Sequence, residues 1–358
     1  MALIRFTTYL RICKAWEKNS RPQCALITGG VLMIVFGPNP LFSQTSPSPP
    51  PTSGSEPPAI SANTSPLPDS TSTSRAAIGP RAGQTWTNSL GMVFKPVPGT
   101  NVLFNRYDTT VQDYRAFVQA TGRQQPGGIC AITVKDNKAG HKTLAWPVNP
   151  SLSWSNPGFP QGPTYPVVGV NWNDAMAFCA WLTQKEQAEG KLGPKQMYRL
   201  PTDAEWTTAA GTHKYAWGDA WPPPAGSANY ADESFAASLP GPGWPRIPGN
   251  DGYARTSPVG SFAANQYGLY DMTGNVWQWD MDWYQASMNS AEVRAGYPAF
   301  NKDGGGHTLK VLRGGSWRYG GPETLAIGYH DCDVPGGANV WAGRRDRTGF
   351  RVVVVPAS

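Results

Sequence analysis

Residues 265–284, NQYGLYDMTGNVWQWDMDWY, decide the fold of this chain. The segment alternates large aromatic side chains with small residues and with carboxylates or amides. Each aromatic ring can bury a large area, and Gly268 and Gly274 allow tight turns between the rings. The segment therefore predicts packed core built around a polar loop. Its six aromatic residues are Tyr267, Tyr270, Trp277, Trp279, Trp283 and Tyr284.

The same segment carries a row of oxygen-bearing side chains within this apolar frame, at Asp271, Thr273, Asn275 and Gln278. Unpaired polar groups are costly in such surroundings. We therefore expect a hard cation or a dense hydrogen-bond network to satisfy them.

The composition describes an aromatic core joined by irregular backbone. Fifteen tryptophans and forty glycines occur in 358 residues, whereas charged residues make up only 15%. This favours turns and loops over long helices. The net charge is +6 and the pI is near 9.0, but the basic residues are scattered. We therefore expect no nucleic-acid binding. We also expect a monomer.

The five cysteines form no CxxC pair, which excludes a zinc ribbon. Cys130 and Cys179 would form a disulfide if the protein is exported and the geometry allows it. A buried free thiol at Cys179 fits its helical surroundings equally well, so the sequence leaves both alternatives open.

Three regions follow one another along the chain. Residues 1–42 contain a basic flank and a short apolar run, Cys24–Gly37, which is typical of an export signal; a membrane anchor is the alternative. Residues 43–84 are rich in Ser, Thr and Pro and predict a disordered linker. Residues 85–358 form the folded domain. We expect an exported protein, whether periplasmic, extracellular or tethered to a membrane.

Within the domain, hydrophobic spacing predicts a first strand in 88–99, a helix over 109–122 and a strand over 166–170. A second helix follows, capped by Asn171 or Asn173. A strand over 197–201 leads to a short helix, which Thr202 and Glu205 open as a capping box. Residues 214–260 predict long ordered loops. A strand precedes the glycines of RGGS, and the last strand, 348–356, is expected to pair with the first.

Five motifs, taken in order, resemble those of the formylglycine-generating enzyme, or sulfatase-modifying factor, family. They are YPVVGVNWNDAMAFCAWL, YRLPTDAEWTTAA, NQYGLYDMTGNVWQW, VLRGGSW and GFRVVV. The resemblance spans about residues 85–356. It implies an α+β domain with the C-type lectin-like fold of the formylglycine-generating enzyme type. Such a domain has low regular secondary structure, two main helices and a small antiparallel sheet.

The resemblance also implies which residues would carry the family's chemistry. Oxidase members hold copper with two cysteines after the serine of RGGS, and the matching positions here are Ser316, Tyr319 and Thr324. Tyrosine and threonine offer no soft ligand, so copper is not expected. Cys332 is the one cysteine nearby, and its neighbours in sequence do not form a metal site.

Two calcium sites of the family also have counterparts. The first matches the oxygen donors of Asn229, Tyr230, Asp251 and Tyr253. The second matches those of Asp271, Gly274, Val276 and Gln278, where glutamine replaces the family's usual glutamate. Oxygen donors of this kind suit calcium.

The sequence leaves three functions open. The first is a binding or scaffold module without oxidase activity, which uses a loop surface between Arg313 and Arg351 to hold a protein, peptide or glycan. A receptor diversified by a retroelement is a variant of it. The second is a formylglycine-generating oxidase. The third is another enzyme, for which the dispersed histidines suggest no catalytic group. The candidate ligand-contacting residues are Arg318, Tyr319, Tyr329, His330, Trp341, Arg344 and Arg345.

Overall fold

The computed structural model describes residues 79–136, 142–239, 246–285, 309–336 and 343–357. All of these described residues belong to one compact unit. None of the helices in these residues is both long and apolar enough to span a membrane.

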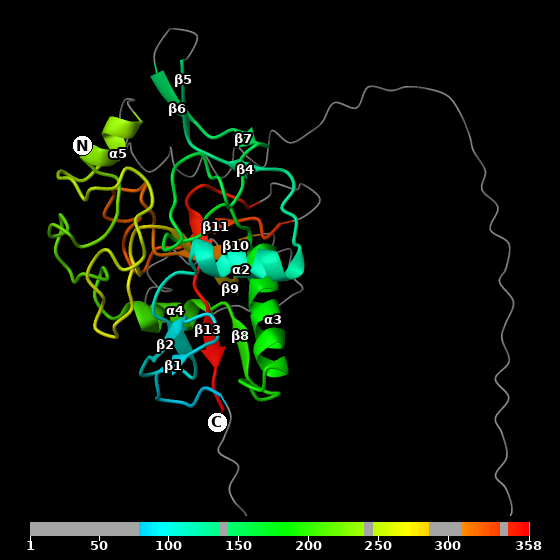
Figure 1. Cartoon of the computed structure of the whole chain (residues 1–358). Coiled ribbons are helices and arrows are strands. Elements are labelled where there is room, and N and C mark those ends of the chain that lie inside the picture. Colours follow the sequence, from blue (N-terminus) through cyan, green and yellow to red (C-terminus); the bar gives the residue numbers. More distant parts are fainter. Residues whose placement is uncertain (1–78, 137–141, 240–245, 286–308, 337–342, 358) are drawn as a thin grey trace, which may run out of the picture. The chain divides into compact units, whose positions relative to one another are not determined.

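The described residues of this unit form two larger sheets, two two-stranded ribbons and four helices (Figure 1). The five-stranded sheet has the order β1 (Trp86–Thr87), β2 (Val93–Pro96), β3 (Leu103–Asn105), β13 (Val353–Val355), β8 (Met197–Arg199). The four-stranded sheet has the order β11 (Asp331–Asp333), β10 (Lys310–Arg313), β9 (Trp277–Trp283), β12 (Thr348–Phe350). The helices are α2 (Val111–Thr121), α3 (Trp172–Ala188), α4 (Asp203–Ala210) and α5 (Glu233–Ser238).

Two short ribbons complete the described strands. They pair β4 (Ile129–Cys130) with β7 (Val148–Asn149), and β5 (Thr133–Asp136) with β6 (Lys142–Ala145). The helices α2 and α3 contact each other and cross in Figure 1. Helices α2, α3 and α4 each begin with a capping box. The side chain of the residue before the helix accepts from the N–H of the third helical residue, and the carboxylate of that third residue accepts from the N–H of the capping residue. Asn171 is the cap of α3, and the predicted cap of α4 at Thr202 is confirmed.

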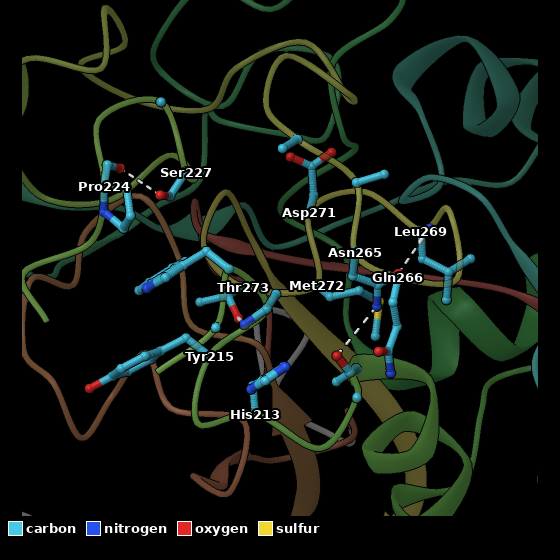
Figure 2. Close-up of a pocket in the computed structure, with 18 of the residues that line it drawn as sticks. His213, Tyr215, Pro224, Ser227, Asn265, Gln266, Leu269, Asp271, Met272 and Thr273 are labelled. Carbon is cyan, nitrogen blue, oxygen red and sulfur yellow. Dashed lines mark hydrogen bonds between the residues drawn. The ribbon is translucent and has the colours of Figure 1, made fainter. Parts of the chain in front are cut away.

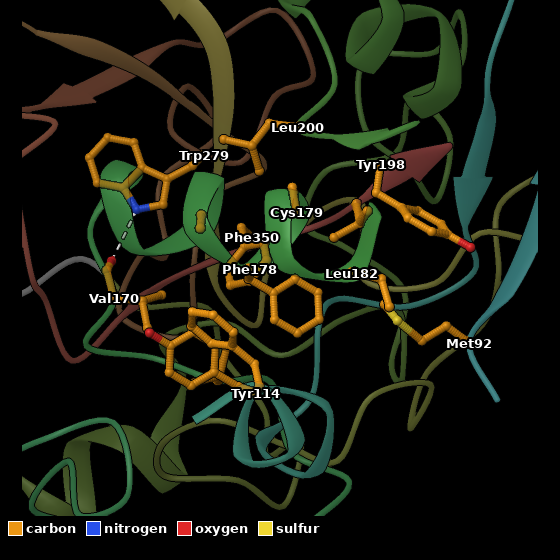
Figure 3. Packing of buried hydrophobic residues seen from close by; sticks show 14 of the residues in the cluster. Met92, Tyr114, Val170, Phe178, Cys179, Leu182, Tyr198, Leu200, Trp279 and Phe350 are labelled. Atoms are coloured by element: carbon orange, nitrogen blue, oxygen red, sulfur yellow. Dashed lines mark hydrogen bonds between the residues drawn. The ribbon is translucent and has the colours of Figure 1, made fainter. Parts of the chain in front are cut away.

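The main core lies between α2, α3 and both sheets (Figure 3). Phe178 of α3 packs against Tyr114 of α2 and Phe350 of β12, with ring centroids 6.2 and 5.4 Å apart. The indole nitrogen of Trp279 donates to the carbonyl of Val170 at 3.1 Å. Trp277 and Trp279 are fully buried, which confirms that the aromatic segment is core.

Three local predictions were wrong. Residues 166–170 form no strand, only a single bridge between Pro166 and Thr110. The run 348–356 breaks into β12 and β13, which belong to different sheets, because buried Arg351 between them bonds to groups outside both strands. The last strand therefore pairs with β3 and β8 rather than with β2. The two ends of the domain do meet, through a parallel bridge between Arg81 and Ala357.

Cys130 and Cys179 are both buried free thiols, so they form no disulfide. Cys179 points from α3 into the main core, whereas the Cys130 thiol contacts the Trp146 carbonyl at 3.0 Å and the Arg345 guanidinium at 3.1 Å. Of the two alternatives that the sequence left open for Cys179, the buried free thiol is the one observed.

Candidate functional site

The RGGS turn after β10 positions the residues that match the family's copper site. Gly314 and Gly315 have positive φ values of 94° and 76°. A Cβ on Gly315 would lie 2.8 Å from the Leu325 side chain, so only glycine fits there. The Trp317 N–H then donates to the Asn275 carbonyl, and the Tyr319 N–H donates to the Ser316 carbonyl, both at 2.9 Å. The turn therefore fixes Ser316 and Tyr319 against the aromatic segment.

Tyr319 fills its position with a packed aromatic ring. The ring meets that of Trp277 edge-on at 5.5 Å between centroids. The guanidinium carbons of Arg318 and Arg347 lie 5.7 and 5.5 Å from the Tyr319 centroid. Thr324 lies in its own turn, where its hydroxyl donates to the Gly321 carbonyl at 3.1 Å. These two side chains present a phenol and a hydroxyl, neither of which is a soft metal ligand.

Several polar groups around Tyr319 are buried without hydrogen bonds. Within the described residues this holds for the Ser316 hydroxyl, the Trp277 indole nitrogen, the Thr348 hydroxyl, and Nε and Nη1 of Arg347. Thr348 pairs with Trp277 across the parallel strands β12 and β9. The surroundings of Tyr319 are thus rich in hydrogen-bond donors, which suit an oxygen-bearing ligand better than copper.

Three of the residues predicted to contact a ligand are buried. Arg318, His330 and Arg344 are at most 6% exposed, and Arg345 is half-buried. They serve as internal ion pairs, as the Arg344–Asp174 pair at 2.8 Å and the Arg345–Asp333 pair at 2.5 Å illustrate.

His330 pairs with Asp203 at 3.0 Å in the same way. Tyr329 is half-buried, with its ring centroid 6.1 Å from that of Trp277. Trp341 lies outside the described residues. The buried members of this set therefore support the loops from within.

The first set of calcium ligands fits a hard cation. Asn229 is fully buried, and its Oδ1 has no hydrogen-bond partner among the described residues. The carboxylate of Asp251 lies beside it, because the Tyr230 N–H donates to Asp251 Oδ2 at 3.0 Å. Burial raises the pKa of Asp251 to about 6, and the charge of Asp232 contributes to the rise. An unpartnered oxygen near two acidic residues is the environment that a bound cation would stabilise.

The second set of predicted calcium ligands does not fit a bound cation. Oε1 of Gln278 already accepts from the indole nitrogen of Trp206 at 2.9 Å and from Nε of Arg351 at 3.1 Å. Its Nε2 donates to the carbonyl of Asp271 at 2.8 Å. Asp271 accepts in turn from the Gly260 N–H. A hydrogen-bond network that includes a guanidinium thus satisfies these oxygens, and we derive no calcium site from Asp271, Gly274, Val276 and Gln278.

A family model described as the sulfatase-modifying factor enzyme 1-like domain matches residues 99–355. The chain belongs to this family. The resemblance that the five motifs carry is thereby confirmed, and with it the α+β, C-type lectin-like fold. The structure of PvdO from Pseudomonas aeruginosa supports the same fold, with a TM-score of 0.50, 22% identity, and coverage of 77% of this chain and 100% of PvdO.

Relatives within the sulfatase-modifying factor family differ in what their names say of activity. The formylglycine-generating enzyme of Thermomonospora curvata is 32% identical over 238 residues, which cover 60% of this chain and 70% of that protein. The inactive C-alpha-formylglycine-generating enzyme 2 of Bos taurus is 36% identical over 158 residues, which cover 43% of this chain and 38% of that protein. Membership of the family therefore does not decide the activity of this chain.

A cavity of about 480 Å³ lies beside the second set of predicted calcium ligands (Figure 2). Most polar side chains that line it already form hydrogen bonds within the fold. Asn265 accepts from the Tyr267 and Leu269 N–H groups, and the Thr273 hydroxyl accepts from the Ala216 N–H. The Ser227 hydroxyl donates to the Pro224 carbonyl. The cavity therefore presents few groups that remain available to a ligand.

A buried acidic cluster of this sulfatase-modifying factor fold was not predicted from the sequence. Asp280 and Asp282 lie on one face of β9 and are fully buried, and the Asp203 N–H donates to Asp282 at 2.5 Å. Burial raises the pKa of Asp282 to about 6 and that of Asp280 well above its usual range. Arg313 pairs with Asp203, while burial lowers the pKa of Arg313 to about 9. In the described part of the chain, no group of three or more His, Cys, Asp or Glu residues is placed to hold a metal.

Proposed function

We propose that this chain is an exported sulfatase-modifying factor domain that acts as a calcium-stabilised binding or scaffold module through its C-terminal loops, without copper oxidase activity. The observation that carries the proposal is the environment of Tyr319. Its ring fills the place of the first copper ligand, and the guanidinium of Arg347 lies 5.5 Å from its centroid. A phenol in that place offers no soft ligand for Cu(I).

The position of the second copper ligand supports the same proposal. The Thr324 hydroxyl is held by its own turn, and a hydroxyl does not replace a thiolate for Cu(I). The thiols of Cys130 and Cys179 are buried elsewhere in the fold, one against Arg345 and the other in the main core. A family member named as inactive, at 36% identity, is consistent with loss of the oxidase activity.

The calcium part of the proposal rests on Asn229 and Asp251. The unpartnered Oδ1 of Asn229 would coordinate a cation there, and the cation would neutralise the charge of the Asp251 carboxylate. Asp251 also orders the loop around it, because it accepts from the N–H groups of Tyr230 and Tyr253 at 3.0 and 2.8 Å. Calcium would then stabilise the loops rather than take part in a reaction.

Formylglycine generation is the competing function, because the enzyme of Thermomonospora curvata is 32% identical over 238 residues. A competition titration against a chromophoric Cu(I) chelator separates the two. The full chain should leave the chelator complex intact, whereas the double variant Tyr319→Cys, Thr324→Cys serves as the reference with a thiol pair. Uptake of one Cu(I) per wild-type chain, unchanged in a Cys332→Ser variant, would contradict the proposal.

A further inference from the structure

A second cavity, of about 380 Å³, lies beside β5 and the C-terminal loop. Its apolar walls include Ile132, Leu152, Pro157 and Phe159, and its charged lining consists of Lys135, Arg255 and Asp346. Small-molecule sites are commonly concave and mostly apolar, with a few placed polar groups and volumes from about 300 Å³ upward. This cavity has a volume in that range, its lining mixes polar and apolar groups, and it does not overlap the residues around Tyr319.

Asp346, which lines this cavity, carries one buried carboxylate oxygen without a hydrogen bond among the described residues. The residue is only 2% exposed. Its Oδ2 accepts from the Ile132 N–H at 2.7 Å. Its Oδ1 takes part in no hydrogen bond within the described residues, although Nη1 of Arg318 lies 4.0 Å away. A buried carboxylate oxygen without a hydrogen bond is costly, so a ligand that brings an N–H group would be stabilised there.

Arg255 offers a cation to the same cavity. Its guanidinium carbon lies 4.9 Å from the ring centroid of Trp317 and 6.0 Å from that of Phe159. Nη1 donates to the Ser238 hydroxyl at 2.8 Å and to the Ala254 carbonyl at 2.9 Å.

No carboxylate of the described residues forms an ion pair with Arg255. Burial lowers the pKa of Arg255, which the charge of Asp346 partly offsets. A guanidinium of this kind favours a carboxylate, which can accept two parallel N–H bonds.

We propose that this cavity binds an α-amino acid unit with a free carboxyl group and an apolar side chain. The α-carboxylate lies on Arg255, the α-nitrogen donates to Asp346 Oδ1, and the side chain packs against Ile132, Leu152 and Phe159. The unit is either a free amino acid or the C-terminal residue of a peptide, which share this chemistry. The inference rests on the proposed binding function and names a ligand class for it.

Isothermal titration calorimetry of the full chain, at constant calcium, tests the proposal with four small probes. N-acetyl-L-leucine carries both features, N-acetyl-L-leucinamide lacks the carboxylate, and 4-methylpentanoate lacks the nitrogen. We expect N-acetyl-L-leucine to bind at least about tenfold more tightly than either analogue. L-leucine is the fourth probe. Tighter binding of L-leucine indicates a free amino acid, and tighter binding of N-acetyl-L-leucine indicates a peptide C-terminus.

Two variants assign the contacts, with Arg115→Gln as the control because Arg115 is an exposed arginine of α2. Arg255→Gln should weaken N-acetyl-L-leucine binding about tenfold or more and leave that of N-acetyl-L-leucinamide unchanged. Asp346→Asn should reduce the preference for N-acetyl-L-leucine over 4-methylpentanoate. Arg255→Gln alone keeps the test decisive if Asp346→Asn does not fold.

Equal affinity for the acid and its amide, or no binding of any probe by the folded wild-type chain, would overturn the inference. Either result leaves the proposed function standing, because a binding module could hold its partner elsewhere on its loops. Copper uptake by the wild-type chain would instead contradict the proposed function and would leave the measured affinities of the probes unchanged.

Discussion

The buried carboxylate of Asp282 makes a prediction at the scale of single residues. Its folded-state pKa of about 6 lies above the ordinary value near 3.9. The protonated form therefore stabilises the fold fully below about pH 4, and this stability is lost as the pH rises through 6. Asp282→Asn cannot ionise, and its amide oxygen can still accept from the Asp203 N–H.

We expect Asp282→Asn to raise the free energy of unfolding at pH 8 by on the order of 2 kcal/mol relative to the wild type, and to have little effect at pH 4. Urea unfolding at both pH values measures this difference. Asp136→Asn, an exposed carboxylate on β5, is the matched control. A gain of equal size at both pH values would show that ionisation of Asp282 is not the cause.

Trp277 makes a second prediction at this scale. Its side chain is fully buried between Tyr319 and Tyr329, with ring centroids 5.5 and 6.1 Å away. Trp277→Ala should destabilise the domain by about 3–5 kcal/mol, since it leaves a large cavity. Half-buried Trp283 in the same strand gives the comparison, and Trp283→Ala should cost clearly less by chemical denaturation. Equal losses for the two variants would contradict the packing described for Trp277.

The sequence predicted apolar residues better than charged ones. Trp277 and Trp279 were expected in the core because aromatic side chains gain from burial wherever the chain places them. His330 and Arg344 were expected at a ligand surface, but their partners Asp203 and Asp174 lie 127 and 170 residues away. The spacing of residues along the chain cannot predict an ion pair between residues so far apart in the sequence.

Among the secondary-structure elements, the starts of the helices depend on neighbouring residues, whereas the bounds and pairing of the strands depend on residues far apart in the sequence. The capping box of Thr202 and Glu205 could be read from the sequence because both groups lie within one turn. The division of 348–356 into β12 and β13 could not. It depends on Arg351, which donates to the Asn105 and Tyr270 carbonyls and to Gln278 and Asp108.

Arg351 is therefore predicted to hold the two sheets together. Arg351→Met should destabilise the domain by about 3–5 kcal/mol, because it leaves the buried carboxylate of Asp108 without its partner at 3.1 Å. The double variant Arg351→Met, Asp108→Asn should recover part of that loss in a double-mutant cycle of unfolding free energies. Arg115→Met on the surface of α2 should be nearly neutral. Additive effects of the two buried substitutions would contradict the coupling.

For the whole molecule, calcium should set the thermal stability. We expect excess EDTA to lower the Tm of the full chain and added calcium to restore it, because a ligand of the native state stabilises by mass action. The effect should weaken below about pH 6, where Asp251 becomes protonated.

The variant Asp251→Asn should abolish the effect of calcium on the Tm. Asp271→Asn should preserve it, since asparagine tolerates the φ of 56° at that position. An unchanged Tm in EDTA at pH 7.5 would contradict the site at Asn229 and Asp251.

The family of the whole molecule could be predicted from its motifs, because they combine core tryptophans with turn glycines that tolerate few replacements. The second calcium site could not be judged in the same way. Its oxygens are satisfied by Trp206 and Arg351, which lie 72 and 73 residues from Gln278. Function is harder still to predict, since Tyr319 and Thr324 change the chemistry of the family's site without changing the turn that presents them.

The most direct test of the central claim is an assay for aldehyde formation. The full chain is incubated with Cu(I), oxygen and a peptide that contains the CxPxR motif, and the products are labelled with an aldehyde-specific hydrazide and measured by mass spectrometry. The formylglycine-generating enzyme of Thermomonospora curvata is the parallel control. The account predicts no aldehyde above the level of a protein-free sample. Peptide converted to formylglycine by this chain in catalytic amounts would contradict it.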